Sequence, residues 1–230
     1  MSKTIMAVGA HTGDAQLTSG LLLARYAQAG DRIITVDLTA GERGTPAGLT
    51  PEQFRPQNVA AAGEFAAMLG GESVVFDIPD GELTDTPEIE LRLARLMREK
   101  QVNVVLYHWK NSMHKDHIQA SRITENAIFF ASLPTFPLDG LTPAPITRSL
   151  YAENWEDAEG FVPYCYFDVS EAFPLWKDAV RRLWLTEHSR DFRYLQYYEA
   201  LSRMRGALIK VDHAVAFAIP DYAKRVKPEL

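Results

Sequence analysis

Apolar strands and amphipathic helices alternate along the first half of the chain, and this alternation limits the fold more than any other feature. Each short apolar run is followed by a helical pattern. The expected strands are residues 4–9, 33–38, 73–78 and 102–107, and the helices between them are residues 15–29, 54–69 and 88–100. Apolar strands separated by helices are typical of a parallel sheet covered on both faces. We therefore predict an α/β fold, Rossmann-like and three-layered, with a mostly parallel sheet.

The second half of the chain is less regular. It contains one proline-rich segment, and neither an internal repeat nor a linker divides it from the first half. We expect one domain over residues 1–230. Within its second half we expect helices at residues 116–133, 170–183 and 190–210, strands at 148–152 and 164–169, and irregular chain at 134–147.

Charge and composition exclude several classes of protein. The formal net charge is −6 over 230 residues, whereas nucleic-acid binders are usually basic, so we expect no nucleic-acid partner. No run of about 18 apolar residues occurs, so no membrane span is expected. The start of the chain enters a strand without a signal-peptide pattern, which predicts a cytoplasmic protein. The single cysteine, Cys165, can form no intramolecular disulfide, and we expect it to be a small apolar residue on a strand.

Four of the six histidines lie in two loops that follow expected strands. The loop GAHTGDAQLTSG follows the first strand and places His11 three residues before Asp14. The loop YHWKNSMHKDH follows the fourth strand and brings His114, Asp116 and His117 together at a helix start. Because ligands bind outside the carboxyl ends of parallel strands, both loops are expected at one functional edge of the sheet.

These residue types favour a metal site. A catalytic zinc ion takes three protein ligands and keeps one position open for water, and His11, Asp14 and His117 supply such a set. We predict Zn²⁺, with another divalent transition metal as the alternative, because the same ligands accept several ions. His114 and Asp116 would lie just outside the ligands, where orienting and proton-transfer groups belong. The alternative interpretation is that the aspartates only stabilise helix starts, which requires no metal.

The two loops resemble the signatures of the LmbE/PIG-L family of metal-dependent N-acetylglucosaminyl deacetylases. That family carries A-H-P-D-D after the first strand and H-P-D-H after a later strand, where this chain has AHTGD and HKDH. Other segments resemble family elements in the same order along nearly the whole chain. They are Thr39–Gly44, Ala60–Gly70, His188–Ser189, Arg205–Ala207 and Ala214–Phe217.

The resemblance implies an LmbE/PIG-L architecture and a function. His11, Asp14 and His117 correspond to the family's metal ligands, and His114 to a histidine that transfers protons or stabilises charge. The implied reaction is metal-dependent removal of an acetyl group from an N-acetylated amino sugar or its conjugate, a small-molecule partner. The resemblance and the aromatic, proline-rich second half also predict a homo-oligomer.

The sequence departs from the family pattern at the position of the general base. Gly13 replaces the family's catalytic aspartate, and a glycine cannot accept a proton. Losing a general base without replacement costs about 10²–10⁴-fold in rate. We predict that His114, oriented by Asp116, takes over this role. Glu42 and Glu153 are weaker options, and for Glu42 a salt bridge to Arg43 or a helix-cap contact is slightly favoured.

Smaller departures from the family pattern also bear on the function. Thr12, Arg190 and Val215 replace the family's proline, glutamine and glutamate. Together with Gly13 they favour, as the alternative function, a non-catalytic or weakly active relative that binds metal and a sugar-like ligand. The interpretation as a nucleotide-binding protein is disfavoured, because the first loop lacks the G-x-G-x-x-G spacing.

The remaining histidines and aromatic residues are assigned more simply. We expect His108 and His213 to be structural and His188 to lie at the rim of the site. For Trp109, packing is favoured over a platform for a sugar ring.

Overall fold

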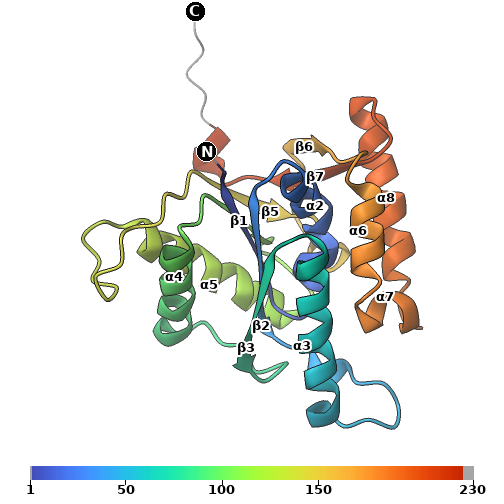
Figure 1. Ribbon diagram of the computed structural model, residues 1–230, viewed down its shortest axis with the longest axis horizontal. Helices are drawn as coiled ribbons and strands as arrows, with labels where there is room; N and C mark the ends of the chain where they lie inside the picture. The colour runs from blue at the N-terminus through green and yellow to red at the C-terminus, as the bar shows by residue number, and fades with distance from the viewer. Residues whose placement is uncertain (1, 225–230) are drawn as a thin grey trace, which may run out of the picture.

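The computed structural model describes residues 2–224, which contain one seven-stranded sheet (Figure 1). The strands are β1 (Thr4–Gly9), β2 (Arg32–Thr39), β3 (Glu72–Ile78), β4 (Val104–His108), β5 (Arg148–Ala152), β6 (Cys165–Asp168) and β7 (Ala214–Ala218). Their order across the sheet is β3-β2-β1-β4-β5-β7-β6. The first five strands pair in parallel, and β7 pairs antiparallel with β5 and β6. The predicted mostly parallel sheet is confirmed.

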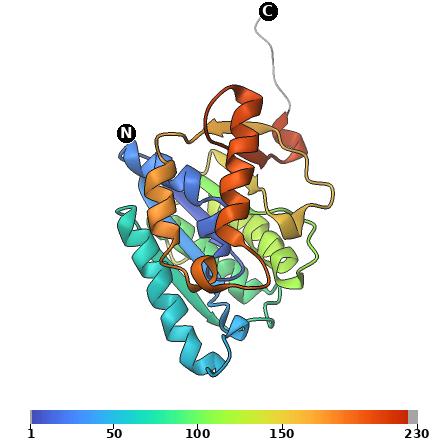
Figure 2. The same ribbon diagram turned by 90° about the vertical axis from the view of Figure 1, so that its right-hand side faces the viewer.

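Helices cover both faces of the sheet (Figures 1 and 2). On one face α4 and α5 pack against Met6 and Val8, while on the other α2, α3, α6 and α8 pack over Ile5 and Ala7. This alternation follows from the period of two along a strand, and it confirms the three-layer α/β class. The helices are α1 (Asp14–Thr18), α2 (Gly20–Gln28), α3 (Pro51–Met68), α4 (Pro87–Lys100), α5 (Lys115–Ser132), α6 (Phe173–Val180), α7 (Trp184–His188) and α8 (Tyr194–Ile209), with short 3₁₀ turns η1 (Glu42–Gly44), η2 (Trp155–Asp157) and η3 (Asp221–Lys224).

The structure differs from the sequence prediction in three elements. Strand β7 was not expected, because AVAFA has few residues with strong strand propensity and depends on its two antiparallel neighbours. The helix expected at 15–29 divides at Ser19 into α1 and α2, and Gly20 there packs against the indole of Trp176. The short helix α7 was also missed. Residue 1 and residues 225–230 of the expected domain lie outside the described residues.

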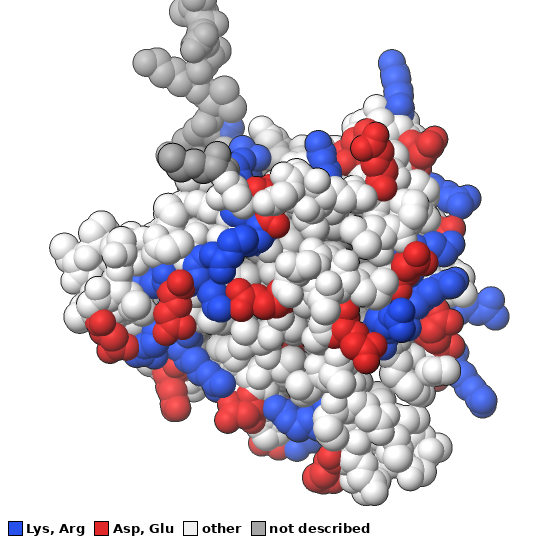
Figure 3. All heavy atoms as spheres, in the orientation of Figure 1, with Lys and Arg blue, Asp and Glu red and all other residues white. Residues whose placement is uncertain are grey.

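Positive and negative side chains are interspersed on the face shown in Figure 3. Among the described residues of this face, no broad basic surface of the kind that nucleic acid requires is visible. Within residues 2–224, no helix is both long and apolar enough to cross a membrane.

Candidate metal centre

The loops that follow β1, β2, β3, β4 and β5 meet at one edge of the sheet and line an open cleft of about 1300 Å³. The two histidine loops both contribute to it, as the neighbouring positions of β1 and β4 in the sheet require. Across the cleft, α7 forms a wall with Trp184, Leu185 and His188. The expected position of the site, at the carboxyl ends of the parallel strands, agrees with this geometry.

Asp14 lies at the centre of the histidine cluster. It begins α1, and its Oδ2 atom accepts the backbone N–H of His11 at 2.8 Å. The same oxygen lies 3.2 Å from His11 Nδ1, 3.3 Å from His108 Nε2 and 3.5 Å from His117 Nε2. Burial by itself would raise the pKa of Asp14, but His117, His108 and His11 hold it well below its usual value. One anionic oxygen therefore faces three imidazoles.

Asp157 orients two of these imidazoles. Its Oδ1 lies 2.9 Å from His117 Nδ1, and its Oδ2 lies 2.8 Å from His108 Nδ1. The two rings stack with centroids 4.1 Å apart. Asp157 is fully buried, and although burial opposes ionisation, His108 and His117 lower its pKa. Because Nδ1 of His117 contacts Asp157, Nε2 is the nitrogen that faces Asp14.

Sequence patterns revealed neither Asp157 nor the place of His108. The expectation for His108 was a structural role, and the ring is indeed buried and accepts the Ala10 N–H through Nε2 at 3.1 Å. It nevertheless lies against Asp14 inside the cluster. The segment NWED is interpreted from sequence as a turn or a substrate loop, and in the structure Asn154 caps η2 and so fixes the turn that presents Asp157.

The other side of His11 faces two carboxylates. Its Nε2 lies 3.2 Å from Asp80 Oδ1 and 3.4 Å from Asp116 Oδ2. Burial would lower the pKa of His11, but hydrogen bonds to Asp116, Asp14 and Asp80 raise it well above its usual value. Asp80 follows β3 and had no part in the sequence prediction.

The prediction that Asp116 orients His114 is wrong. The Asp116 carboxylate turns toward His11 and accepts the Gly81 N–H at 2.8 Å. The ring of His114 instead caps α5, since its Nδ1 accepts the Asp116 backbone N–H at 3.2 Å. A residue at a helix start caps the free backbone N–H groups with its own side chain, which leaves the next carboxylate free to reach another loop.

His114 lies beside the two predicted histidine ligands. Its ring centroid is 4.7 Å from that of His117, in a stacked arrangement, and 4.7 Å from that of His11, edge to face. Burial, followed by the charges of His11 and His117, lowers the pKa of His114. The lowered pKa favours the neutral ring, and because Nδ1 accepts a backbone hydrogen bond, Nε2 is the nitrogen left to carry the proton.

Gly13 adopts a conformation that other residues rarely enter, with φ at 120°. A Cβ atom on this residue would lie 2.5 Å from Leu185 Cδ2. The Gly13 N–H donates to Gln16 Oε1 at 2.9 Å, and Gln16 in turn donates to the buried carboxyl of Asp37. Leu185 therefore occupies the space beside Gly13.

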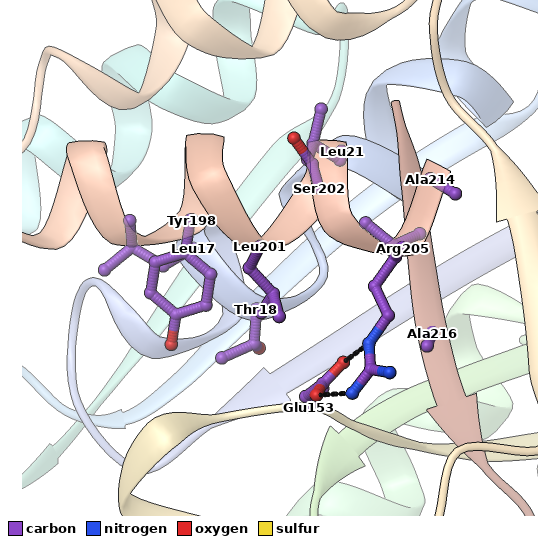
Figure 4. Close-up of a pocket in the computed structure, with 11 residues that line it drawn as sticks. Leu17, Thr18, Leu21, Glu153, Tyr198, Leu201, Ser202, Arg205, Ala214 and Ala216 are labelled. Atoms are coloured by element: carbon purple, nitrogen blue, oxygen red, sulfur yellow. Dashed lines mark hydrogen bonds and ion pairs between the residues drawn. The ribbon is translucent and has the colours of Figure 1, made fainter. Parts of the chain in front are cut away.

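Two weaker candidates for a base are engaged elsewhere. Glu42 is buried, accepts the Asp80 N–H at 2.9 Å and pairs with Arg55 at 3.2 Å, so the favoured structural role is confirmed although its partner is not Arg43. Glu153 forms a two-pronged ion pair with Arg205 of α8 beside a separate small pocket (Figure 4). Neither carboxylate is free to act in the cleft.

Glu156 supplies a carboxylate that no sequence motif singled out. It lines the cleft, and its Oε2 lies 3.9 Å from His117 Nε2. Burial raises the pKa of Glu156. It is carried by the same η2 turn that presents Asp157.

The other assignments made from sequence agree with the structure. His188 lies at the cleft, exposed to solvent. His213 stacks on Phe173 with centroids 3.7 Å apart and hydrogen-bonds Ser202, which is a packing role. Trp109 is 9% exposed and donates to the Glu159 carbonyl, so it packs rather than forming an open platform.

The arrangement of donors fits a divalent metal ion. Among the described residues, three groups have ligand atoms that all lie within 4.8 Å of one another: His11 with His114 and His117, Asp14 with His108 and His117, and His11 with Asp80 and Asp116. The predicted ligands His11, Asp14 and His117 are divided between the first two groups. The outer nitrogens of His11 and His117 are directed at carboxylates, which is the usual support for metal-binding imidazoles. Imidazole and carboxylate donors suit zinc and several other divalent ions.

Comparison with known proteins agrees with this geometry. The family model PIG-L, described as GlcNAc-PI de-N-acetylase, matches residues 6–128, more than half of the chain. The 4-oxalmesaconate hydratase of Pseudomonas putida is 26% identical over 224 residues, which cover 94% of this chain and 84% of that protein. The 1D-myo-inositol 2-acetamido-2-deoxy-alpha-D-glucopyranoside deacetylase of Streptomyces avermitilis is 28% identical over 175 residues, covering 64% of this chain and 60% of that protein.

A solved structure extends the similarity to the whole fold. The conserved protein TT1542 of Thermus thermophilus superposes with a TM-score of 0.79 at 28% identity, covering 96% of each chain. The family match includes β1, β4 and both histidine loops. The chain belongs to the PIG-L family.

Proposed function

We propose that the protein is a metal-dependent hydrolase that removes an acetyl group from an N-acetylated amino sugar or its conjugate. The observation that carries this proposal is the convergence of His11, Asp14 and His117 at the cleft, with the outer nitrogen of each histidine directed at a carboxylate. The family description and the deacetylase relative support the reaction. We assign these three residues as ligands and Zn²⁺ as the ion, with other divalent ions as alternatives.

A divalent ion bound there supplies a Lewis acid for the amide carbonyl and lowers the pKa of a water. The chain's own residues do the rest. Neutral His114 presents its Nε2–H to the cleft, where it can donate to oxygen that gains negative charge. The sequence predicts His114 as the general base, but Nδ1 of this ring accepts the Asp116 backbone N–H. We propose Glu156 as the proton acceptor instead, because its carboxylate lines the same cleft beside His117. Leu185 keeps water away from the space next to Gly13.

A second function, addition of water to a carbon–carbon double bond of an unsaturated oxo acid, is favoured by one specific observation. The relative that covers 94% of this chain is named a hydratase. The family resemblance associates an aspartate at the position of Gly13 with amide hydrolysis. A reaction other than amide hydrolysis is therefore compatible with glycine at this position. Arg43, Lys115 and Arg190 line the cleft and offer positive charge for carboxylates.

Both functions are tested with one purified, zinc-loaded protein. Acetate release is measured on a panel of N-acetylglucosamine conjugates, and loss of ultraviolet absorbance on conjugated unsaturated oxo acids. We expect acetate release. Absorbance loss without acetate release would replace the proposal with the hydratase. Stoichiometric metal without either reaction would favour the non-catalytic relative.

Removing the imidazole of His114, or the charge of Glu156, is expected to lower kcat about 10²-fold or more, the usual size of a lost proton-transfer group. His114→Asn keeps a good helix cap for α5, and Glu156→Gln keeps the shape of the side chain. The melting temperatures of both variants should therefore stay near that of the wild type. Glu159→Gln, in the same segment but exposed, is the control and should leave kcat unchanged. Wild-type kcat in either site variant would remove that residue from the mechanism.

We also propose a homo-oligomer. Apolar side chains on the outer face of α8 are exposed, among them Met204 at 50% and Leu208 at 61%. Burying such side chains between subunits is favourable. Light scattering at micromolar concentration should return a multiple of the mass of one chain, and Leu208→Asp should shift it toward a single chain. A wild-type mass of one chain would contradict the proposal.

A further inference from the structure

The outer nitrogen of His11 has an unusual environment, because two carboxylates from different loops face it. Asp80 Oδ1 and Asp116 Oδ2 lie 3.2 and 3.4 Å from Nε2. The Asp116 side chain has no exposed surface, and its other oxygen, Oδ1, is buried without a hydrogen-bond partner. Nε2 of His11 is itself buried without a hydrogen-bond partner of good geometry, so both carboxylates approach it at ion-pair distance only.

The surrounding backbone holds both carboxylates in place. Asp80 Oδ2 accepts the Arg43 N–H at 2.9 Å, and the Asp80 N–H donates to buried Glu42 at 2.9 Å. Asp116 Oδ2 accepts the Gly81 N–H at 2.8 Å. Three segments, η1, the loop after β3 and the start of α5, thus fix the two acidic groups around one ring. Such construction argues against chance proximity of acidic side chains.

We propose that Asp80 and Asp116 are paired positioning residues that enclose Nε2 of His11 and so direct its Nδ1 toward the metal. This inference rests on the proposed metal centre. A carboxylate beside the outer nitrogen of a ligand histidine fixes the ring and increases its basicity. Because two carboxylates flank the same nitrogen, each substitutes in part for the other. Loss of both should therefore cost more than the product of the two single losses.

Zinc affinity measures this role without any substrate. The dissociation constant is obtained by competition with a chromophoric chelator for wild type, Asp80→Asn, Asp116→Asn and the double variant. Removing such a support typically costs about 10–100-fold in affinity, so we expect about 10-fold for each single variant and more than 100-fold for the double. The visible absorption spectrum of the Co²⁺-loaded protein should change in the variants, since it reports ligand geometry. Asp77→Asn, three residues before Asp80 and 82% exposed, is the matched control and should bind zinc like the wild type.

A background lacking His11 shows whether the carboxylates act through it. The His11→Ala protein should bind zinc more weakly than the wild type. Adding Asp80→Asn to it should change the zinc dissociation constant by less than about twofold. If Asp80→Asn lowers zinc affinity in His11→Ala as much as it does in the wild type, the proposal is overturned. Single and double variants that bind zinc like the wild type would also overturn it. Two zinc ions per wild-type chain would also overturn it, because Nε2 would then be a ligand itself.

Failure of the proposed function gives a different result. A wild type that binds no divalent ion removes the metal centre and the inference together. A wild type with one ion, but without activity on any substrate, leaves the affinity comparison intact. Melting temperatures of the metal-free proteins separate lost affinity from lost folding, and the single variants suffice if the double variant does not fold.

Discussion

Asp14→Asn is expected to abolish stoichiometric metal binding and to lower acetate release by about 10³-fold or more. The carboxylate oxygen of Asp14 is the atom shared by His11, His108 and His117, and the neighbouring histidines keep it ionised. An amide has the same shape but no charge, so it is a poor ligand for a divalent cation. The lost Lewis acid would be worth several kcal/mol of transition-state stabilisation, which corresponds to this rate change.

The measurement is metal content per chain after dialysis, together with acetate release. The melting temperature of the metal-free variant should remain close to that of the metal-free wild type, because the amide oxygen of the substituted side chain can still accept the His11 N–H. Loss of metal with retained folding assigns Asp14 as a ligand. An Asp14→Asn protein that still holds one zinc ion per chain would show that the ion binds elsewhere.

Gly13→Asp is expected to destabilise the protein and to restore no activity, although it introduces the aspartate that the family resemblance implies at this position. A φ of 120° is costly for any residue with a side chain, of order 1–3 kcal/mol. The contact of a new Cβ with Leu185 adds an overpacking cost of about 1–3 kcal/mol. We therefore expect the free energy of unfolding to fall by at least about 2 kcal/mol, measured by urea denaturation.

Two further variants separate the causes. Gly13→Ala adds the Cβ without the carboxylate and should account for most of the loss. Leu185→Ala in the Gly13→Asp background removes the steric contact but not the backbone strain, so it should recover only part of the stability. A stable Gly13→Asp protein with strongly increased acetate release would mean that the wild type is a weakened deacetylase whose base was lost, and that α7 can move aside.

Much of the fold could be predicted from sequence because its signals are local. Strands β1 and β4 are nearly continuous apolar runs, and α3 begins with its own side-chain cap, Thr50. Strand β7 lacked such a signal, since its short alanine-rich segment is stable only between β5 and β6. Pairing between distant segments leaves no periodicity for a local pattern to reveal.

The sequence by itself determined the parallel sheet and the edge at which the two histidine loops meet, because the loops that follow parallel strands emerge at the same edge of the sheet. Only the tertiary structure decided which carboxylate serves which histidine. Asp157 holds His117 and His108, and Asp116 turns to His11 rather than to His114. Some hydrogen-bond partners, such as His117 and Asp157, lie 40 or more residues apart in the sequence. Their pairing depends on side-chain direction and burial in the folded chain, and neither can be predicted from spacing along the sequence.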